Sequence, residues 1–536
     1  MLSSNSVWSV KIVEQDGLWN ATVELMPDQR RSIAQHFHDR TKYDPTTLAS
    51  KTQRLDWRNQ PIPFKEYKIG TVYDLKPYLN AEPALDPGDK QWQRLARLLF
   101  CSYGLTVKMT MMNGEAFYLR AAPSAGGLYP AEVYLISRGT PQLPAGLYHY
   151  QTQTNSLLHF WETEAWKPLQ EACFWHPALD TTQMALVVTV VFGRSAWRYQ
   201  DRAYRRIFLD SGHLLGNIEL AAAINDYRPH LIGGFRDEAV NQLMYLDVSQ
   251  EGAIAVIPLA DLWDIDQNLP PTPTALPSAI QTDYPEIPDG QLLGYMHQAT
   301  QISGALAPDR PPAPPSRTDS DSDQYNFPFC LKVSMESGAI AWGDHLAELE
   351  KTMLKRRSTR AYSGADLTLE ELRLLLDFTY QPAHYLDQGL DRSPDYFDLS
   401  LIETFIAISG VEGLEEGCYY YAPKAQELRQ IRFKNFRREL HTLCLGQDLG
   451  RDAAAVLFHT ADLQRAVAQY GDRAYRYLHM DAGHLGQRLN LAAVRLGLGV
   501  SGIGGFFDDQ VNEVLGIPPD EAVLYITTLG RGRPSE

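Results

Sequence analysis

The sequence predicts an α+β protein that carries two copies of one domain in tandem, with a small αβ module before the first copy. A repeat at a fixed offset is the main observation, since Arg202-Ala203-Tyr204-Arg205 returns as Arg473-Ala474-Tyr475-Arg476 (473 − 202 = 271). Length is the second observation, because 536 residues are too many for one ordinary core. Other blocks keep the same offset: Tyr199 with Tyr470, Asp210 to His213 with Asp481 to His484, Gly146 to Tyr150 with Gly417 to Tyr421, and Gly233-Gly234-Phe235 with Gly504-Gly505-Phe506. Several blocks in one register indicate a duplicated domain.

Composition excludes several classes of function. Hydrophobic residues make up 44% and charged residues 21% of the chain, as in soluble globular proteins. The net charge of −16 argues against a nucleic-acid partner, because phosphate groups would be repelled. No stretch reaches about 18 apolar residues, so we expect no membrane span and no membrane partner.

The cysteines and the N-terminus point to a reducing compartment. The five cysteines include no Cys-x-x-Cys pair, and no His/Asp/Glu spacing suggests a metal site. The first residues lack the apolar segment of a signal peptide. We therefore expect a cytoplasmic protein without a bound metal.

Residues 1–85 lie outside the repeat. Two alternating runs, Val7 to Val13 and Leu18 to Leu25, flank the turn signal Asp16-Gly17 and predict a β-hairpin. A helix is expected from Pro27 onward. Together these elements predict the small αβ module.

The first copy is expected over residues 86–263. Apolar residues at helical spacing from Trp92 to Leu99 predict its opening helix. The β-branched run from Met184 to Phe192 predicts a buried strand. Ile207 to Ala223 is apolar around its circumference and predicts a central helix.

A linker and the second copy complete the chain. We expect the linker over residues 264–330, where Pro311 to Asp323 is proline-rich and then rich in Ser and Asp. The second copy, residues 331–536, is expected to begin with a helix from Trp342 to Lys355. Thr368 and Glu371 form the capping-box pattern of a following helix.

Two segments have the composition of a ligand site. Lys355-Arg356-Arg357-Ser358-Thr359-Arg360 offers guanidinium groups and a hydroxyl to an anion such as a phosphate. A solvated basic end of a helix is the alternative. The small residues of the loop Ala122 to Pro130 let a flat ligand lie against the backbone, although such residues are also common in ordinary turns. A second basic cluster, Leu529 to Arg533, closes the chain.

These motifs resemble those of FMN-dependent enzymes with the nitroreductase fold, which carry Arg-Arg-Ser-x-Arg, a Pro-Ser-Ala-Gly loop, Gly-Gly-Phe and a late Gly-x-x-Arg. Phe37 to Pro45, Leu55-Asp56-Trp57 and Arg194 to Arg205 are similar to segments of SagB-type dehydrogenases. Those enzymes oxidise thiazoline and oxazoline rings in modified peptides, and the tandem arrangement resembles the cyanobactin thiazoline oxidases. The resemblance implies tandem nitroreductase-like α/β domains, each an antiparallel sheet with flanking helices, that form a pseudo-dimer in one chain.

The resemblance also implies one FMN site shared by the two copies. The cofactor would be held by these residues: Arg356, Arg357, Ser358, Arg360, Ile503, Gly504, Gly505, Arg531 and Arg533 of the second copy, and Pro123, Ser124, Ala125, Gly126 and Gly127 of the first. The reciprocal site has Pro394-Asp395-Tyr396-Phe397-Asp398 and Lys76-Pro77-Tyr78-Leu79-Asn80 in these places, which would clash with a flavin and lack the arginines. We therefore expect one FMN per chain, either between its own copies or between the chains of a homodimer.

The expected catalytic residues depart from the family. Its Lys-Tyr pair is replaced by Arg198-Tyr199 in the first copy and Gln469-Tyr470 in the second, and arginine does not deprotonate in proteins. Arg198, Tyr199 and Tyr470 are the candidates, and Tyr199, with a pKa lowered by Arg198, is the expected base or proton donor. A packing role for Tyr199 is the alternative.

The function implied by the resemblance is an FMN-dependent oxidase. It would convert thiazoline or oxazoline rings of a ribosomally made precursor peptide to thiazole or oxazole. An NAD(P)H-dependent nitro- or quinone reductase and a flavin-free scaffold of a peptide-maturation complex are the alternatives. For residues 1–85, a leader-peptide clamp that adds a strand and a structural cap on the first copy both stay open.

Overall fold

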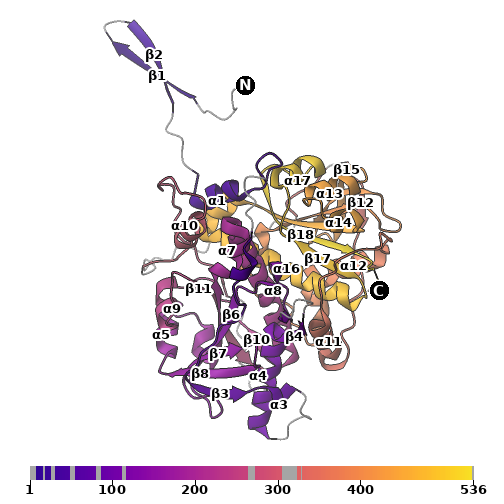
Figure 1. The fold of residues 1–536 in the computed structure, drawn as a ribbon. Coiled ribbons are helices and arrows are strands. Elements are labelled where there is room, and N and C mark those ends of the chain that lie inside the picture. The colour runs from indigo at the N-terminus through magenta and orange to yellow at the C-terminus, as the bar shows by residue number, and fades with distance from the viewer. Residues whose placement is uncertain are drawn as a thin grey trace.

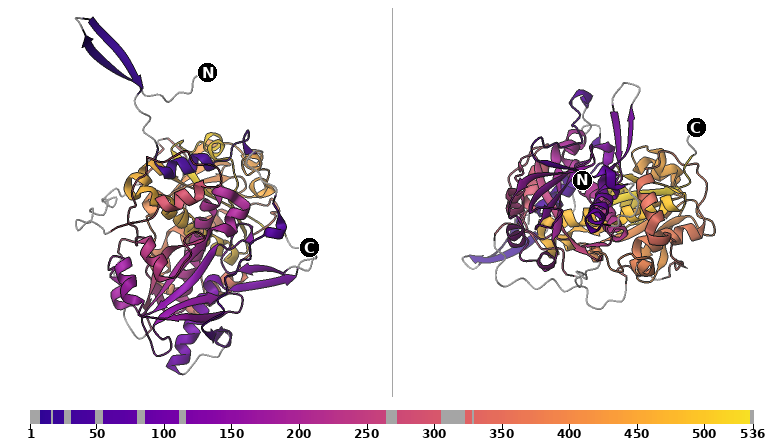
Figure 2. Two further views of the ribbon diagram at one scale, coloured as in Figure 1. Left: turned by 60° about the vertical axis from the view of Figure 1, so that its left-hand side comes forward. Right: turned by 90° about the horizontal axis from the view of Figure 1, so that it is seen from below.

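The computed structural model describes residues 8–15, 18–25, 31–48, 55–79, 86–110, 116–263, 272–304, 323–327 and 329–533. Two antiparallel sheets lie on either side of a central helix pair, so the predicted α+β tandem fold is confirmed (Figure 1). The right-hand view in Figure 2 shows the N-terminal copy, in purple and magenta, beside the C-terminal copy, in orange and yellow.

Both sheets have the same strand order, as expected of a duplication. The first sheet runs β3 (Thr71–Asp74), β8 (Ser156–Glu162), β7 (Gly146–Gln151), β6 (Ala131–Ser137), β9 (Met184–Val191), β11 (Glu251–Asp261) and β10 (Tyr227–Pro229). The second runs β12 (Lys332–Ser334), β15 (Glu427–Phe433), β14 (Gly417–Ala422), β13 (Glu403–Ile408), β16 (Ala455–Asp462), β18 (Glu521–Gly530) and β17 (Gly499–Ile503). A separate hairpin of β4 (Leu105–Thr110) and β5 (Ala116–Arg120) stands out from the first copy in Figure 2.

The helices repeat in the same way. The first copy has α3 (Lys76–Leu79), α4 (Pro87–Tyr103), α5 (Trp166–Ala172), α6 (Ala178–Thr181), α7 (Phe192–Tyr199), α8 (Ala203–Ile224) and α9 (Asp237–Leu243). The second has α11 (Ala347–Lys355), α12 (Leu369–Tyr380), α13 (Arg437–Leu443), α14 (Asp448–Asp452), α15 (Leu463–Tyr470), α16 (Ala474–Arg495) and α17 (Asp508–Leu515). The Thr368 capping box at α12 is confirmed, whereas α11 begins at Ala347 and not at the predicted Trp342.

The two central helices, α8 and α16, cross at glycines. A Cβ atom on Gly212 would lie 2.1 Å from the carbonyl oxygen of Met480, and one on Gly483 would lie 2.3 Å from that of Leu209. Gly212 corresponds to Gly483 and Leu209 to Met480 at the 271-residue offset, so the two contacts are equivalent. A pseudo-twofold axis therefore passes between the glycines. The stretch Phe192–Ile224 is long and apolar enough to span a membrane, but 89% of its most apolar window is buried inside the protein, as in a core helix.

Buried ion pairs connect the copies reciprocally. Asp508 of the second copy binds Arg202 at 2.8 Å and Arg205 at 2.6 Å in the first. Asp237 of the first copy, its counterpart by the offset, binds the arginines of the second copy, Arg473 at 2.6 Å and Arg476 at 2.8 Å. The repeated Arg-Ala-Tyr-Arg motif is therefore an interface motif, in which each copy contributes the carboxylate that neutralises the other copy's arginines.

Two helices outside the predicted copies extend the repeat. In α1 (Ile33–Thr41) the carbonyl oxygen of Thr41 accepts a hydrogen bond from Arg202, and the amide of Ala34 donates one to Asp472. In α10 (Leu292–Ala299) the pattern recurs with a 259-residue offset: the adjoining Thr300 accepts from Arg473, and Leu293 donates to Asp201. Helix α10 was predicted to be part of the linker, but it packs on the second copy as α1 packs on the first.

The N-terminal hairpin is confirmed as β1 (Trp8–Gln15) paired with β2 (Leu18–Leu25). Its turn at Asp16-Gly17 lies outside the described residues. The helix expected from Pro27 begins at Ile33, because Ser32 caps it and forms a capping box with Gln35. Residues 311–322 of the expected linker also lie outside the described residues.

The glycine crossing gives a testable prediction. Gly483→Ala should lower the free energy of unfolding by about 1–3 kcal/mol, since the added methyl group meets the Leu209 carbonyl and the helices must separate. Gly193→Ala in α7 is the matched control, because its Cβ meets nothing within 4 Å. Denaturant unfolding of both variants checks this, and equal stability of the two would contradict the close crossing.

Candidate functional site

A cavity of about 740 Å³ opens where the two copies meet. The first copy contributes the loop after β5 and one face of α8, and the second contributes the segment after α11 and the turn after β17. Of the predicted site residues, the cavity wall includes Pro123, Ser124, Ala125, Gly126, Gly127, Arg198, Arg356, Arg357, Ser358, Arg360 and Gly504. The volume is within the range of small-molecule and cofactor sites.

The wall from the second copy is basic. Arg356 ends α11 and crosses to the first copy, where its Nε donates to the carbonyl oxygen of Ala121 at 2.8 Å. Its Nη1 is buried and makes no hydrogen bond within the described residues. Burial lowers the pKa of Arg356 to about 10, so the guanidinium remains charged at neutral pH. An unpaired buried guanidinium nitrogen on a cavity wall is suited to an anionic ligand.

The wall from the first copy is a tight loop held by a carboxylate. Asp210 on α8 accepts hydrogen bonds from the Ser124 hydroxyl at 2.6 Å and from the Ala125 amide at 3.1 Å. Gly126 has a φ of +68°, and a Cβ atom there would lie 2.8 Å from the Tyr199 hydroxyl. Only glycine therefore allows the loop to approach α7 so closely.

Burial raises the pKa of Tyr199 above its ordinary value, although Arg206 and Arg198 both act to lower it. The expected net lowering of this pKa is therefore wrong: Arg198 acts in the expected direction, but the desolvation of the phenol outweighs both arginines. The Arg206 guanidinium lies over the Tyr199 ring, 3.6 Å from its centroid, and its buried Nη1 has no hydrogen-bond partner within the described residues. Tyr199 is thus a neutral phenol that packs against the small-residue loop next to Gly126, and it does not itself line the cavity.

A hydrogen-bond chain of fixed direction begins at Tyr525 on the cavity wall. Asn217 donates to the backbone carbonyl of Ser102, so its side-chain oxygen must accept from the Gln487 amide at 2.6 Å. The Gln487 oxygen then accepts from His213 Nδ1 at 2.8 Å, and His213 Nε2 accepts from the Tyr525 hydroxyl at 2.9 Å. Burial lowers the pKa of His213 to about 3, which keeps the ring neutral. Tyr525 thereby directs its proton away from the cavity.

The corresponding loop of the second copy is closed. Tyr396 stacks on His484, the counterpart of His213, with ring centroids 4.2 Å apart, and Phe397 stacks on Tyr477 at 4.6 Å. Asp481 accepts from the amides of Phe397 and Asp398, as Asp210 does from Ala125. The rings therefore close off the volume that the small residues leave open in the first copy.

Burial raises the pKa of Asp210 to about 7. Burial raises the pKa of Asp481, which anchors the closed loop, to the same value. The shift therefore belongs to the buried loop anchor of each copy and does not by itself mark Asp210 as a reacting group.

Several predicted site residues lie outside the cavity wall. Arg531 pairs with Glu371 at 2.9 Å, and Arg533 donates to the carbonyl oxygen of Tyr362. Tyr470 donates to Asp398 in the closed loop, at 3.0 Å. Ile503 is buried at the end of β17, and Gly505 follows it next to Leu445 and Arg206. The structure thus gathers the arginine segment and the small-residue loop but not the C-terminal arginines.

Arg206, Asp210 and Tyr525 line the cavity but were not predicted as site residues. The repeat contained a signal for two of them: the offset pairs Arg206 with Tyr477 and Tyr525 with Ile254. At both positions the copies differ in charge or polarity. Asp210 could not be found this way because Asp481 matches it.

Part of the cavity wall is apolar. Val107 and Met109 of β4 and Phe117 and Leu119 of β5 line the cavity, following the alternation of the two strands. No group of three or more His, Cys, Asp or Glu side chains that could hold a metal ion occurs in the part of the chain that the structure describes.

Comparison with known proteins identifies relatives of the whole chain and of its halves. The profile of the Nitroreductase family matches residues 95–260 and 353–531. A crystal structure of a protein from Anabaena variabilis ATCC 29413 that carries a nitroreductase name is 70% identical, covers 94% of this chain and 100% of its own, and superposes with a TM-score of 0.90.

Two curated proteins match part of the chain. A protein of Methanocaldococcus jannaschii that carries a nitroreductase name is 34% identical over 184 residues, 34% of this chain and 91% of that protein. The Microcin B17-processing protein McbC of Escherichia coli is 29% identical over 135 residues, 24% of this chain and 49% of that protein, so the match spans about half of McbC. With its two matched regions and its two equivalent sheets, the chain belongs to the nitroreductase family and carries the family's domain twice.

Proposed function

We propose that this nitroreductase-family oxidoreductase binds one FMN in the inter-copy cavity and oxidises azoline rings of a peptide to azoles. The observation that carries the proposal is the composition of the cavity wall: five arginines from both copies, a single carboxylate and a loop of small residues. This wall matches a ligand that is flat at one end and carries a phosphate at the other.

The residues present fit such a ligand. Arg198, Arg206, Arg356, Arg357 and Arg360 line the cavity, and Asp210 is the acidic residue among them. The buried Nη1 atoms of Arg206 and Arg356 have no partner among the described residues, so a bound anion would satisfy groups that are otherwise costly to bury. Arg356 and its neighbours would hold the phosphate, and the loop Pro123 to Gly127 would face the flavin ring.

When bound, FMN supplies the two-electron acceptor that an azoline needs to become an azole. Tyr199 stays protonated near neutral pH, because burial raises its pKa. We therefore assign Tyr199, whose hydroxyl lies beside Gly126 of the cavity wall, the role of hydrogen-bond donor to the substrate and not that of base. Arg198, its neighbour in the chain, lines the cavity and would hold a carbonyl or carboxylate group of the peptide.

The similarity to the microcin B17-processing protein supports the peptide substrate. The similarity to the Methanocaldococcus jannaschii protein supports a second candidate, an NAD(P)H-dependent reductase. The decisive assay incubates the flavin-loaded protein with a thiazoline-bearing peptide under air and follows the peptide mass. Loss of two hydrogen atoms per ring supports azoline oxidation, whereas bleaching of the flavin by NADPH without any change in the peptide supports the reductase.

The arginine segment gives a prediction for cofactor affinity. Arg360→Gln should weaken FMN binding by roughly 10- to 100-fold, the effect of losing one charge-assisted hydrogen bond. Arg533→Gln is the matched control, because it also removes a guanidinium group of the second copy but Arg533 lies outside the cavity wall. Fluorescence titration of apoprotein with FMN measures both variants. A larger loss with Arg533→Gln would place the phosphate at the C-terminal cluster instead.

The repeat provides an internal control for Tyr199. Tyr199→Phe should lower kcat for azoline oxidation by about 100-fold or more, the usual contribution of a positioned proton donor, and leave FMN affinity unchanged. Tyr470→Phe, its counterpart in the closed copy, should leave kcat unchanged, because Tyr470 binds Asp398 there. Equal rates for both variants in single-turnover kinetics would exclude Tyr199 from the chemistry.

A further inference from the structure

A second cavity, of about 360 Å³, is the pseudo-twofold counterpart of the proposed cofactor site. Five of its lining residues correspond to lining residues of the first cavity at the 271-residue offset: Leu390 to Leu119, Pro394 to Pro123, Asp395 to Ser124, His484 to His213 and Leu231 to Gly502. Tyr396 and Phe397 close the other part of this region. The duplication therefore left a smaller cavity behind the closed loop.

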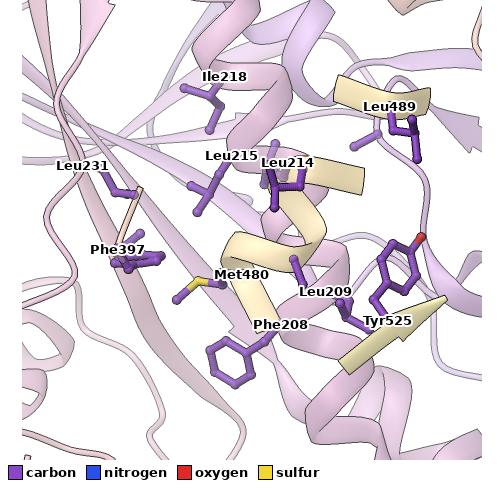
Figure 3. Close-up of a cluster of buried hydrophobic side chains, with 14 of the residues drawn as sticks. Phe208, Leu209, Leu214, Leu215, Ile218, Leu231, Phe397, Met480, Leu489 and Tyr525 are labelled. Carbon is purple, nitrogen blue, oxygen red and sulfur yellow. The ribbon is translucent and has the colours of Figure 1, made fainter. Parts of the chain in front are cut away.

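The wall of this second cavity is mainly aliphatic. Leu215 and Ile218 project from α8 on the side of Leu231 and Phe397, as Figure 3 shows. Leu386 and Leu390 of the second copy complete the apolar wall. Leu215 stands where the repeat has Gly486, and Leu231 where it has Gly502. The Tyr525 side chain packs against both glycines, so aliphatic side chains line the second cavity where a tyrosine ring packs in the first.

Charge distinguishes the second cavity from the first. Arg228 binds Asp395 at 2.8 Å and Asp391 at 2.9 Å, so its charge is already balanced by two carboxylates. Glu219 binds Arg488 at 2.9 Å. Carboxylates exceed arginines on this wall, where Glu219, Asp226, Asp391 and Asp395 face Arg228 and Arg392. An anion such as a flavin phosphate would be repelled here.

Two buried polar atoms on this wall have no hydrogen-bond partner within the described residues: the Tyr227 hydroxyl and His484 Nδ1. His484 Nε2 faces the Glu219 carboxylate at 3.4 Å and so carries the ring proton, which leaves Nδ1 as an acceptor. Tyr227 is 1% exposed, and its ring lies under the Arg94 guanidinium, 4.1 Å away. Orphaned buried groups of this kind cost free energy unless a ligand or water reaches them.

We propose that this second cavity is a binding site for an uncharged, largely aromatic or aliphatic small molecule that carries one hydrogen-bond donor, of which phenol and indole are the simplest. The aliphatic wall buries the ring, and His484 Nδ1 accepts the ligand's O–H or N–H. The site is separate from the proposed cofactor cavity and does not depend on the activity proposed for it.

Calorimetric titration of the full-length protein with phenol, indole and benzoate tests the proposal. Phenol and indole should bind, whereas benzoate, of similar size but anionic, should bind at least about tenfold more weakly, since the carboxylates on this wall outnumber the arginines and Arg228 is already paired with two of them. Benzoate binding as tightly as phenol, or no binding of phenol and indole at millimolar concentration, would overturn the proposal.

Two variants locate the bound molecule. Leu231→Trp and Ala223→Phe each add bulk to the cavity wall and should weaken phenol binding by about tenfold or more. Ile62→Trp, at a position 73% exposed, is the control and should bind phenol as the unmodified protein does. Thermal unfolding identifies any variant that fails to fold, and the other variant then decides. Phenol binding that persists in a folded wall variant would place the molecule elsewhere and refute the site.

Discussion

The exchange of carboxylates between the two copies is the constraint on which the rest of the structure depends. Asp237 and Asp508 each neutralise the arginine pair of the opposite copy, and all six side chains are almost fully buried. Removing one partner of such a pair typically costs about 3–5 kcal/mol, because a charge remains buried without compensation. The copies are therefore held in one relative position, in which α8 and α16 cross at Gly212 and Gly483.

This fixed position builds the site from two sides. It brings Arg356 of the second copy against the loop backbone of the first, where its Nε bonds to the Ala121 carbonyl. The pseudo-twofold axis relates this site to a second, equivalent place in the protein. There Tyr396 stacks on His484 and Phe397 on Tyr477, both in α16. A homodimer would have to keep both sites or lose both, whereas a duplicated chain can keep one and let the other diverge. Divergence left the first position basic and open, and the second acidic, smaller and aliphatic.

The duplication and most of the site could be predicted because both depend on local sequence. The offset of 271 residues shows the repeat directly, and Arg356 to Arg360 and Pro123 to Gly127 were predicted from composition and resemblance. The role of the Arg-Ala-Tyr-Arg motif could not be predicted, because its partners Asp237 and Asp508 lie far away in the sequence. The equivalence of α1 and α10 could not be predicted. Their offset is 259 residues instead of 271, and the equivalent contacts are made by backbone carbonyl groups, which leave no pattern in the sequence. The pKa direction of Tyr199 was wrong because the neighbouring arginine was visible in the sequence but the burial was not.

We expect one open cofactor site and one closed counterpart to coexist in each chain. The most direct measurement is the flavin content of the protein after saturation with FMN and removal of the excess, taken as the ratio of flavin absorbance to chain concentration. We expect one flavin per chain, bound at a single class of sites in the titration. Two flavins per chain would contradict a single site, because the Tyr396 and Phe397 rings would then have to move off His484 and Tyr477 to make room for the second flavin.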